Sequence, residues 1–305
     1  MAAALDKRKR PAACGTGFYV RHWCNKDPCG LICAAISWFL VLYAECTVVG
    51  VVLYPWMGLS PLGMLHMAAF TALCFLALAS HGKAMLTDPG AVPESALPLA
   101  LANATSKDEI SRLEEQKYRT CRRCRQFKPG RAHHCSICDR CVIKMDHHCP
   151  WVNNCVGLGN HKFFLLFIFY VFLLSSYALL LVFMRYARCI NETCPSNGAL
   201  RIVFLVLEAV LFGLFTLCMM CDQYSVIMTG TTQIDRLKGE TVETLGLREV
   251  FGGASPRFSL QWLLPVDIWF PRSVKHQLLG YVLEEELVLS DDDTDLESFL
   301  PSDSG

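Results

Sequence analysis

Four long apolar segments constrain the fold of this 305-residue chain more than any other feature of its sequence. They cover residues 31–54, 62–80, 163–184 and 202–221. As a helix, the first segment would reach roughly 36 Å at about 1.5 Å per residue, which is enough to cross a bilayer. Hydrophobic residues make up 53% of the chain and charged residues 18%, which argues against a soluble protein with buried helices. We therefore predict an all-α integral membrane protein with four transmembrane helices.

Lysine and arginine side chains are distributed unevenly around these segments. Residues 82–162 contain thirteen and the N-terminal arm, residues 1–30, contains six, whereas the turn at 55–61 has none and the loop at 185–201 has three. The positive-inside rule predicts that both termini and residues 82–162 are cytosolic and that the 185–201 loop is lumenal. The formal net charge is zero, so we expect no nucleic-acid partner.

The predicted lumenal loop carries two cysteines, Cys189 and Cys194, and a glycosylation sequon at Asn191. Oxidising conditions would permit a disulfide there, but the sequence leaves open whether the two cysteines pair. A second sequon, at Asn103, falls in the predicted cytosolic loop and should stay unmodified. A glycan on Asn103 would reverse the predicted orientation.

A run rich in metal ligands lies in the large predicted cytosolic loop. Between Cys121 and Cys155 the chain has seven cysteines and four histidines. The cytosol is reducing, which favours metal binding over disulfides for thiols clustered in this way. The pairs Cys121/Cys124 and Cys135/Cys138 have the two-residue spacing that lets paired thiolates reach one zinc ion. Two tetrahedral sites need eight of the eleven candidates, and spacing alone does not divide the ligands between two ions.

Near its end the run reads Asp146-His147-His148-Cys149-Pro150-Trp151, and earlier it contains His133-His134-Cys135. These residues, within segments 133–141 and 145–157, resemble the signature of the DHHC protein S-acyltransferases. The match is dense over residues 121–164, and weaker agreement extends along the whole chain, including Thr87-Asp88-Pro89-Gly90. Residues 29–33 and 87–93 are similar to a Golgi-resident, broad-specificity branch of that family. The resemblance implies a Golgi location, with the endoplasmic reticulum as an alternative.

The resemblance also implies a role for each candidate residue. One structural zinc ion would be held by Cys121, Cys124, His134 and Cys141, and a second by Cys135, Cys138, His148 and Cys155. Cys149 would be the nucleophile, His147 its base and Asp146 the group that orients the imidazole. A histidine partner lowers the cost of forming a thiolate, because a free thiol has a pKa of about 8.5. We expect His133 to support a zinc ligand rather than transfer protons.

The implied reaction moves a long-chain acyl group in two steps. Acyl-CoA, mainly palmitoyl-CoA, would acylate Cys149 and release CoA, and the acyl group would then pass to a cysteine of a membrane-associated protein substrate. The main alternative is a non-catalytic membrane zinc-ribbon adaptor, and a channel or transporter is a more distant one. An adaptor would need the eight metal ligands but not Asp146, His147 or Cys149, so their presence favours the enzyme.

Two positions depart from the family pattern. A threonine-rich motif after the last span usually ends in glutamate, whereas this chain has Asp235, which keeps a carboxylate. An asparagine commonly precedes the segment that matches residues 247–252, and this chain has Gly246 there. We expect this glycine to loosen the contact between the C-terminal segment and the catalytic loop.

One face of the third apolar segment carries Phe164, Phe167, Val171 and Leu174 at intervals of three and four residues. A thioester on Cys149 needs a dry place for its acyl tail, so we expect this stripe to line a cavity between the spans, although helix packing alone would also explain it. Leu174 would lie about 15 Å along the helix from Phe164, at a depth where its bulk limits the length of the acyl chain.

The predicted organisation therefore has seven parts. They are an N-terminal arm (1–30), helices one and two (31–81), a linker (82–120), a cysteine-rich two-zinc catalytic domain (121–162), helices three and four with the lumenal loop (163–221), a cytosolic membrane-associated segment (222–289) and an acidic disordered tail (290–305).

Overall fold

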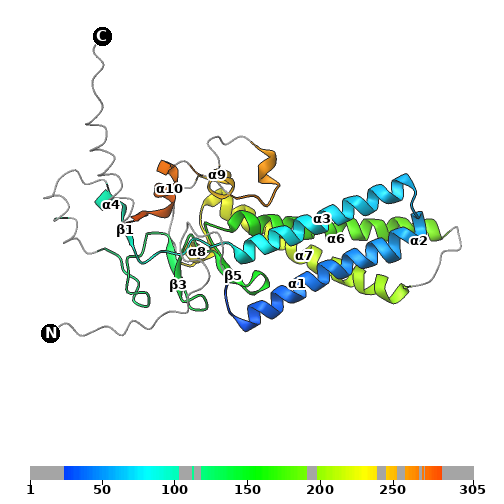
Figure 1. The fold of residues 1–305 in the computed structure, drawn as a ribbon, viewed down its shortest axis with the longest axis horizontal. Helices are drawn as coiled ribbons and strands as arrows, with labels where there is room; N and C mark the ends of the chain where they lie inside the picture. Colours follow the sequence, from blue (N-terminus) through cyan, green and yellow to red (C-terminus); the bar gives the residue numbers. More distant parts are fainter. Residues whose placement is uncertain are drawn as a thin grey trace, which may run out of the picture.

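The structure is a computed structural model that describes residues 24–102, 112, 118–190, 198–238, 245–252, 258–267, 270 and 272–283. Among these residues, four helices are long and apolar enough to cross a membrane, which confirms the predicted fold class. They lie together in a bundle, and the cysteine-rich domain lies at one end of it (Figure 1). The two sequons, Cys194 and the acidic tail lie outside the described residues.

The first span continues past the proline that indicated a turn. Helix α1 (Pro28–Thr47) passes into a π-helical segment (Val48–Leu53) and then into α2 (Tyr54–Met57). A proline within a helix removes one hydrogen bond and clashes with the carbonyl four residues earlier, which is here that of Val51. The wider π-helical turn accommodates Pro55, and the Arg185 guanidinium donates a hydrogen bond to the Val51 carbonyl.

The other three spans also extend beyond the segments expected from hydropathy. Helix α3 covers Pro61–Leu86, α6 covers His161–Cys189 and α7 covers Ala199–Thr229. Their side chains meet in a continuous core in which Phe70, Leu181 and Leu205 are almost completely buried. Cys189, at the end of α6, is disulfide-bonded. The ends of α3 and α7 near the cysteine-rich domain are more polar than the apolar segments but still helical, so both helices extend beyond the spans expected from hydropathy.

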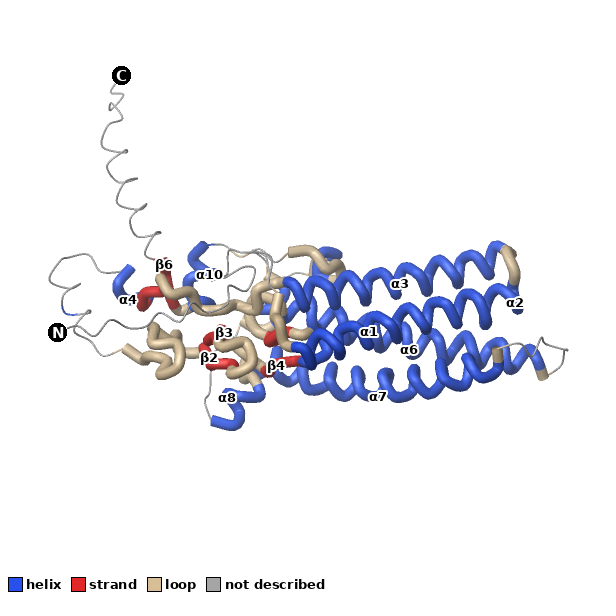
Figure 2. The backbone as a smooth tube through the Cα atoms, turned by 60° about the horizontal axis from the view of Figure 1, so that its bottom comes forward, coloured by secondary structure: helices blue, strands red, loops and turns tan. Residues whose placement is uncertain are grey.

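Short antiparallel hairpins shape the cysteine-rich domain (Figure 2). Strand β2 (Ala132–Cys135) pairs with β3 (Arg140–Ile143), and β4 (His147–Cys149) pairs with β5 (Asn154–Val156) through the 3₁₀ turn Pro150–Val152. A third pair joins β1 (Ala96–Pro98) in the linker to β6 (Tyr281–Leu283) near the C-terminus. Isolated two-stranded hairpins are marginal in water, so these need the support of packing and of bound ligands.

The chain leaves the bundle after α3 and returns to it at α6 through a single junction. The Gly159 N–H donates to the Pro89 carbonyl at 3.1 Å. A Cβ atom at Gly157 would lie only 2.5 Å from that same carbonyl, so the close approach requires glycine. The Asn160 side chain closes the junction, since it donates to the Ala84 carbonyl at 3.0 Å.

Short helices after α7 lie at the end of the molecule that carries the cysteine-rich domain (Figure 1). They are α8 (Gln233–Lys238), α9 (Leu247–Phe251), the 3₁₀ turn Leu260–Trp262 and α10 (Arg272–Leu279); α4 (Leu99–Ala102) lies in the linker. The Lys162 ammonium, at the start of α6, donates to the Gln261 carbonyl at 2.8 Å. The aromatic segment that includes Trp262 therefore lies where the bundle meets the cysteine-rich domain, as a membrane-interface segment would.

Candidate active site and metal centres

Two groups of three cysteines and one histidine converge in the described part of the cysteine-rich domain. The first contains Cys121, Cys124, His134 and Cys141, and the second contains Cys135, Cys138, His148 and Cys155. Within each group, the potential ligand atoms all lie within 4.8 Å of one another. The structure thus brings together the two ligand sets that the family resemblance implied.

The separations within each group fit a tetrahedral metal centre. In the first, Nδ1 of His134 lies 3.2 Å from the Cys124 sulfur, which lies 3.8 Å from the Cys141 sulfur. In the second, Nδ1 of His148 lies 3.4 Å from the Cys138 sulfur. Ligand atoms bound about 2.3 Å from one ion at tetrahedral angles are about 3.8 Å apart. Four soft ligands at this spacing suit a closed site without an open coordination position.

Strand alternation explains how one short hairpin serves two sites. Successive residues of a strand point to opposite faces, so His134 and Cys135 on β2 belong to different metal groups. The same alternation on β4 directs His148 to a metal group and places His147 and Cys149 together on the other face. The Asp-His-His-Cys order therefore follows from a strand that carries a metal ligand on one side and the reactive pair on the other.

The reactive pair is in contact with Asp146. Nδ1 of His147 lies 2.9 Å from the Asp146 carboxylate, and the Cys149 thiol is near enough to contribute to the raised pKa of His147. The edge-to-face contact of Phe164, with a centroid distance of 5.4 Å, holds the imidazole from a third side. Cys149 is 7% exposed, so the thiol is shielded from bulk water. The structure thus brings together the three side chains for which the sequence predicts the roles of nucleophile, base and orienting group.

Asp146 and His147 stabilise one another in their charged forms. Burial raises the pKa of Asp146, but hydrogen bonds from His147, the Gln233 backbone and Gln223 outweigh burial and lower the pKa to about 2. Burial also lowers the pKa of His147, but Asp146 and the Cys149 thiol raise it to about 9. At neutral pH the carboxylate and the imidazolium are therefore both charged, and they form an ion pair next to Cys149.

Two residues that hold Asp146 were not identified from the sequence. The Gln223 amide donates to Asp146 at 2.9 Å, while its oxygen accepts a hydrogen bond from His161 at 2.6 Å. The Gln233 backbone N–H donates to the other carboxylate oxygen at 3.0 Å. The sequence feature that could have indicated this contact is a glutamine just after the fourth apolar segment, but the expected span ended at Cys221.

Hydrogen bonds through His81 connect two helices to the turn that follows Cys149. The Trp38 indole N–H donates to Nδ1 of His81 at 2.9 Å. An indole N–H can only donate, so the His81 proton is on Nε2, which donates to the Trp151 carbonyl at 2.8 Å. These hydrogen bonds fix Trp151 two residues after Cys149.

The two positions that depart from the family pattern both lie near buried contacts. Asp235 lies 3.2 Å from Nε2 of His133, so the shorter carboxylate reaches a partner in the cysteine-rich domain. The support of a zinc ligand by His133 stays a prediction. Gly246 has a φ of +59°, a conformation that favours glycine, and precedes α9. In α9, Glu249 pairs with Arg131 at 2.7 Å and with Lys144 at 3.0 Å, which anchors this segment; the loosening expected at Gly246 stays a prediction.

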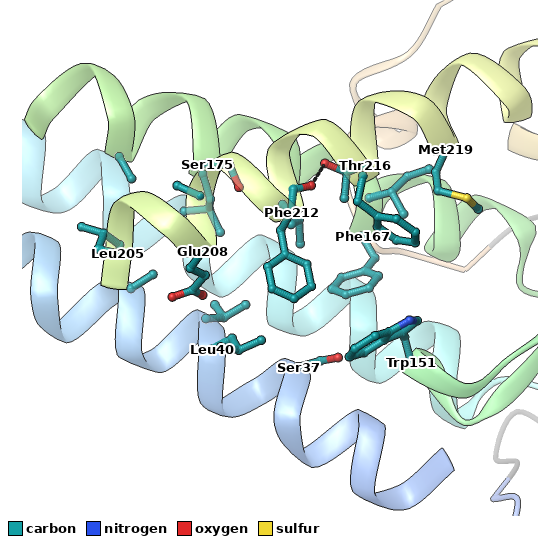
Figure 3. Close-up of a pocket in the computed structure, with 18 of the residues that line it drawn as sticks. Ser37, Leu40, Trp151, Phe167, Ser175, Leu205, Glu208, Phe212, Thr216 and Met219 are labelled. Carbon is teal, nitrogen blue, oxygen red and sulfur yellow. Dashed lines mark hydrogen bonds between the residues drawn. The ribbon is translucent and has the colours of Figure 1, made fainter. Parts of the chain in front are cut away.

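A cavity begins at Cys149 and extends between α1, α6 and α7. It encloses about 860 Å³, counting the space at its open mouth. Figure 3 shows Trp151 and Phe167 toward one end and Leu205 and Glu208 toward the other. The stripe expected on the third span does line it: Phe164, Phe167, Val171 and Leu174 are all in the wall.

A buried thiol, a histidine charged next to it and an apolar cavity that starts at the sulfur define a membrane enzyme suited to carrying an acyl chain on cysteine. Comparison with known sequences supports the same class of protein. The sequence model of the DHHC palmitoyltransferase family matches residues 114–240. The chain is 41% identical to palmitoyltransferase ZDHHC3 of Rattus norvegicus over 271 residues, covering 84% of this chain and 85% of the relative.

Other relatives extend the similarity. The chain is 41% identical to palmitoyltransferase ZDHHC7 of Mus musculus, covering 80% of this chain and 81% of the relative. It is 33% identical to probable protein S-acyltransferase 12 of Arabidopsis thaliana, covering 68% and 75%. This chain therefore belongs to the DHHC palmitoyltransferase family.

Proposed function

We propose that this chain is a protein-cysteine S-palmitoyltransferase that carries the acyl group as a thioester on Cys149. The single observation that carries the proposal is the cavity, which is lined mainly by apolar side chains and includes Cys149 in its wall. Each methylene that leaves water for such a surface contributes about 0.8 kcal/mol, so a palmitoyl tail would gain most of its binding energy there. The thioester carbon would then lie at the cavity mouth, next to His147.

The proposed first step transfers the acyl group from CoA to the enzyme. The Cys149 sulfur attacks the carbonyl carbon of palmitoyl-CoA, the bond from that carbon to the CoA sulfur breaks, and the CoA thiolate takes a proton from His147. In the second step His147 accepts the proton of a substrate cysteine, whose sulfur attacks the Cys149 thioester. Asp146 keeps the imidazole oriented in both steps.

We propose zinc for both Cys₃His groups. When bound, zinc would hold the hairpins in place by contributing folding energy, and no reaction step passes through it. The soft ligand set and the tetrahedral spacing support zinc over magnesium or calcium, which prefer oxygen ligands. Because β4 carries both His148 and the reactive pair, loss of the second ion would also disorder the active site.

The proposed partners are palmitoyl-CoA, the lipid bilayer and membrane-associated proteins with an accessible cysteine. The concentration of lysine and arginine in residues 82–162 supports a cytosolic catalytic domain, with both termini on the same side. The similarity of residues 29–33 to the Golgi-resident branch supports a Golgi location, and the endoplasmic reticulum is the alternative.

Labelling with an alkyne analogue of palmitate separates the enzyme from a membrane adaptor. The wild-type chain should acquire a label that hydroxylamine removes, and Cys149→Ser should lose both this label and transfer to substrate proteins. Cys218→Ser is the matched control, because Cys218 is an exposed cysteine on α7. Labelling that persists undiminished in Cys149→Ser would contradict the proposal and favour the adaptor.

A further inference from the structure

Two cysteines at the start of α1 lie outside both metal groups. Cys29 is exposed and Cys33 is partly exposed. They are four residues apart, so they lie on one face of the helix. Both are at the cytosolic end of the first span, and cysteines at such a membrane boundary are common sites of reversible S-acylation.

The end of α1 that carries these cysteines is packed against the turn that follows Cys149. A Cβ atom at Gly30 would lie only 2.1 Å from the Asn153 side-chain oxygen, so the helix touches this turn closely. The Asn153 amide also donates to the Asn25 carbonyl at 2.7 Å. This end of α1 and the reactive turn are therefore fixed relative to one another.

The next turn of the same helix reaches the acyl cavity. Ser37 lies four residues after Cys33 on the same face, and it lines the cavity together with Cys149. In Figure 3 the Ser37 hydroxyl is directed toward Trp151, two residues beyond the nucleophile. Cys33 lies between Gly30 and Ser37 on this face of α1, and therefore between the part of the helix that packs on the turn after Cys149 and the part that lines the cavity.

We infer that Cys33 accepts the acyl group of Cys149 within the same chain. This inference rests on the proposed function, because it requires a thioester on Cys149. The Cys33 sulfur would attack the thioester carbonyl carbon, the bond from that carbon to the Cys149 sulfur would break, and the proton lost by Cys33 would pass to Cys149. One thioester replaces another, so the step is balanced without an oxidant, a reductant or a further reactant.

The position of the cavity allows the lipid tail to stay in place during this transfer. Only the carbonyl end has to move between the two sulfurs, because Ser37 places the Cys33 face of α1 at the cavity that already holds the tail. Cys46 lacks this relationship, since it lies about 20 Å further along the same helix. Exposure alone therefore does not select the acceptor.

Site-resolved mass spectrometry tests the inference. The purified full-length protein in lipid nanodiscs would be incubated with palmitoyl-CoA, quenched in acid and digested, and acylation of Cys33 and Cys149 would be measured separately. In the wild type both residues should be acylated, and Cys149→Ser should lower acylation of Cys33 by about tenfold or more. Cys33→Ser and Cys33→Ala should leave Cys149 acylated, and Cys46→Ser should change neither signal.

Protein concentration distinguishes transfer within one chain from transfer between chains. An intramolecular step depends on effective rather than bulk concentration, so the ratio of acylated Cys33 to acylated Cys149 should not change on about tenfold dilution. Acylation of Cys33 that persists in Cys149→Ser, or that falls on dilution, would overturn the inference. Acylated Cys149 with unmodified Cys33 would overturn it too but leave the proposed function standing, whereas unmodified Cys149 would refute the proposed function itself.

Discussion

The imidazole of His133 and the carboxylate of Asp235 lie 3.2 Å apart, although 102 residues separate them in the sequence. Both side chains are almost fully buried, at 5% and 1% exposure. The second oxygen of Asp235 accepts the Thr232 N–H at 3.1 Å, which sets the start of α8. Because Gln233 follows directly, this contact is what directs its N–H to Asp146 in the active site.

Removal of the Asp235 carboxylate should therefore slow the formation of the acyl-enzyme. A buried hydrogen bond to a charged group contributes about 1.5–3 kcal/mol, so Asp235→Ala should lower the rate of Cys149 acylation about tenfold or more. Rapid-quench measurement of autoacylation would check this. Asp222→Ala is the control: that carboxylate also contacts α8, through Gln233 and Arg236, but is 30% exposed and should matter little. Equal effects of the two variants would refute the role of Asp235.

His147→Ala should slow the first chemical step strongly. The loss of a general acid or base typically lowers a rate by roughly 10²–10⁴-fold, and His147 donates the proton that the CoA thiolate takes in this step. The measurement is the rate of autoacylation with palmitoyl-CoA at neutral pH. Metal content must stay at the wild-type value, because His147 points away from the metal groups. A rate within a factor of about two of wild type would exclude His147 as the proton donor of this step.

Metal analysis tests the two Cys₃His groups independently of catalysis. The purified protein should contain two zinc ions per chain, and Cys149→Ser should retain both, since Cys149 belongs to neither group. Cys121→Ser should lose one ion and lower the thermal unfolding midpoint, because structural zinc contributes folding energy. A content near one ion, or a loss of metal in Cys149→Ser, would show that the ligands are divided differently.

Leu174 should limit the length of the acyl chain. Its side chain lines the cavity about 15 Å along α6 from Phe164. Leu174→Ala should shift autoacylation toward stearoyl-CoA, because two more buried methylenes are worth about 1.6 kcal/mol, or roughly tenfold in relative rate. Rates with myristoyl-, palmitoyl- and stearoyl-CoA would be compared. Leu180→Ala, on the same helix but 51% exposed and absent from the cavity wall, should keep the wild-type profile. An unchanged profile in Leu174→Ala would remove Leu174 from this role.

Glycosylation tests the orientation in the membrane. With the cysteine-rich domain cytosolic, Asn191 is lumenal and eligible for a glycan, whereas Asn103 is not. In microsomes, Asn103→Gln should therefore leave the electrophoretic mobility unchanged, with or without glycosidase treatment. A faster-migrating Asn103→Gln chain would mean that Asn103 carries a glycan, which would invert the topology.

Features with a local pattern could be predicted from the sequence, and features that depend on contacts between distant segments could not. Helical periodicity placed Leu174 and its stripe in the cavity wall, because residues three and four apart share a face. No such rule places Gln223 against Asp146, since that contact depends on how α7 packs against β4. The turn predicted to begin at Pro55 is a second example, because the helix continues past this proline. The Val51 carbonyl, which has no N–H partner at Pro55, accepts a hydrogen bond from Arg185 of another span.

The single junction between Pro89 and Gly159 has a consequence for how such a protein can diversify. A segment whose two ends meet at one point can be inserted into, or exchanged between, scaffolds without changing the distance between the flanking elements. Here the Asn160 contact and the close-packed glycines would keep α3 and α6 in place around a changed insert, but the insert must also keep its contacts with Gln223 of α7 and with the start of α1. Changes on the part of the insert that faces away from the bundle can therefore accumulate separately from changes in the bundle, whereas changes at Asp146 and Asn153 must be matched by the helices that contact them.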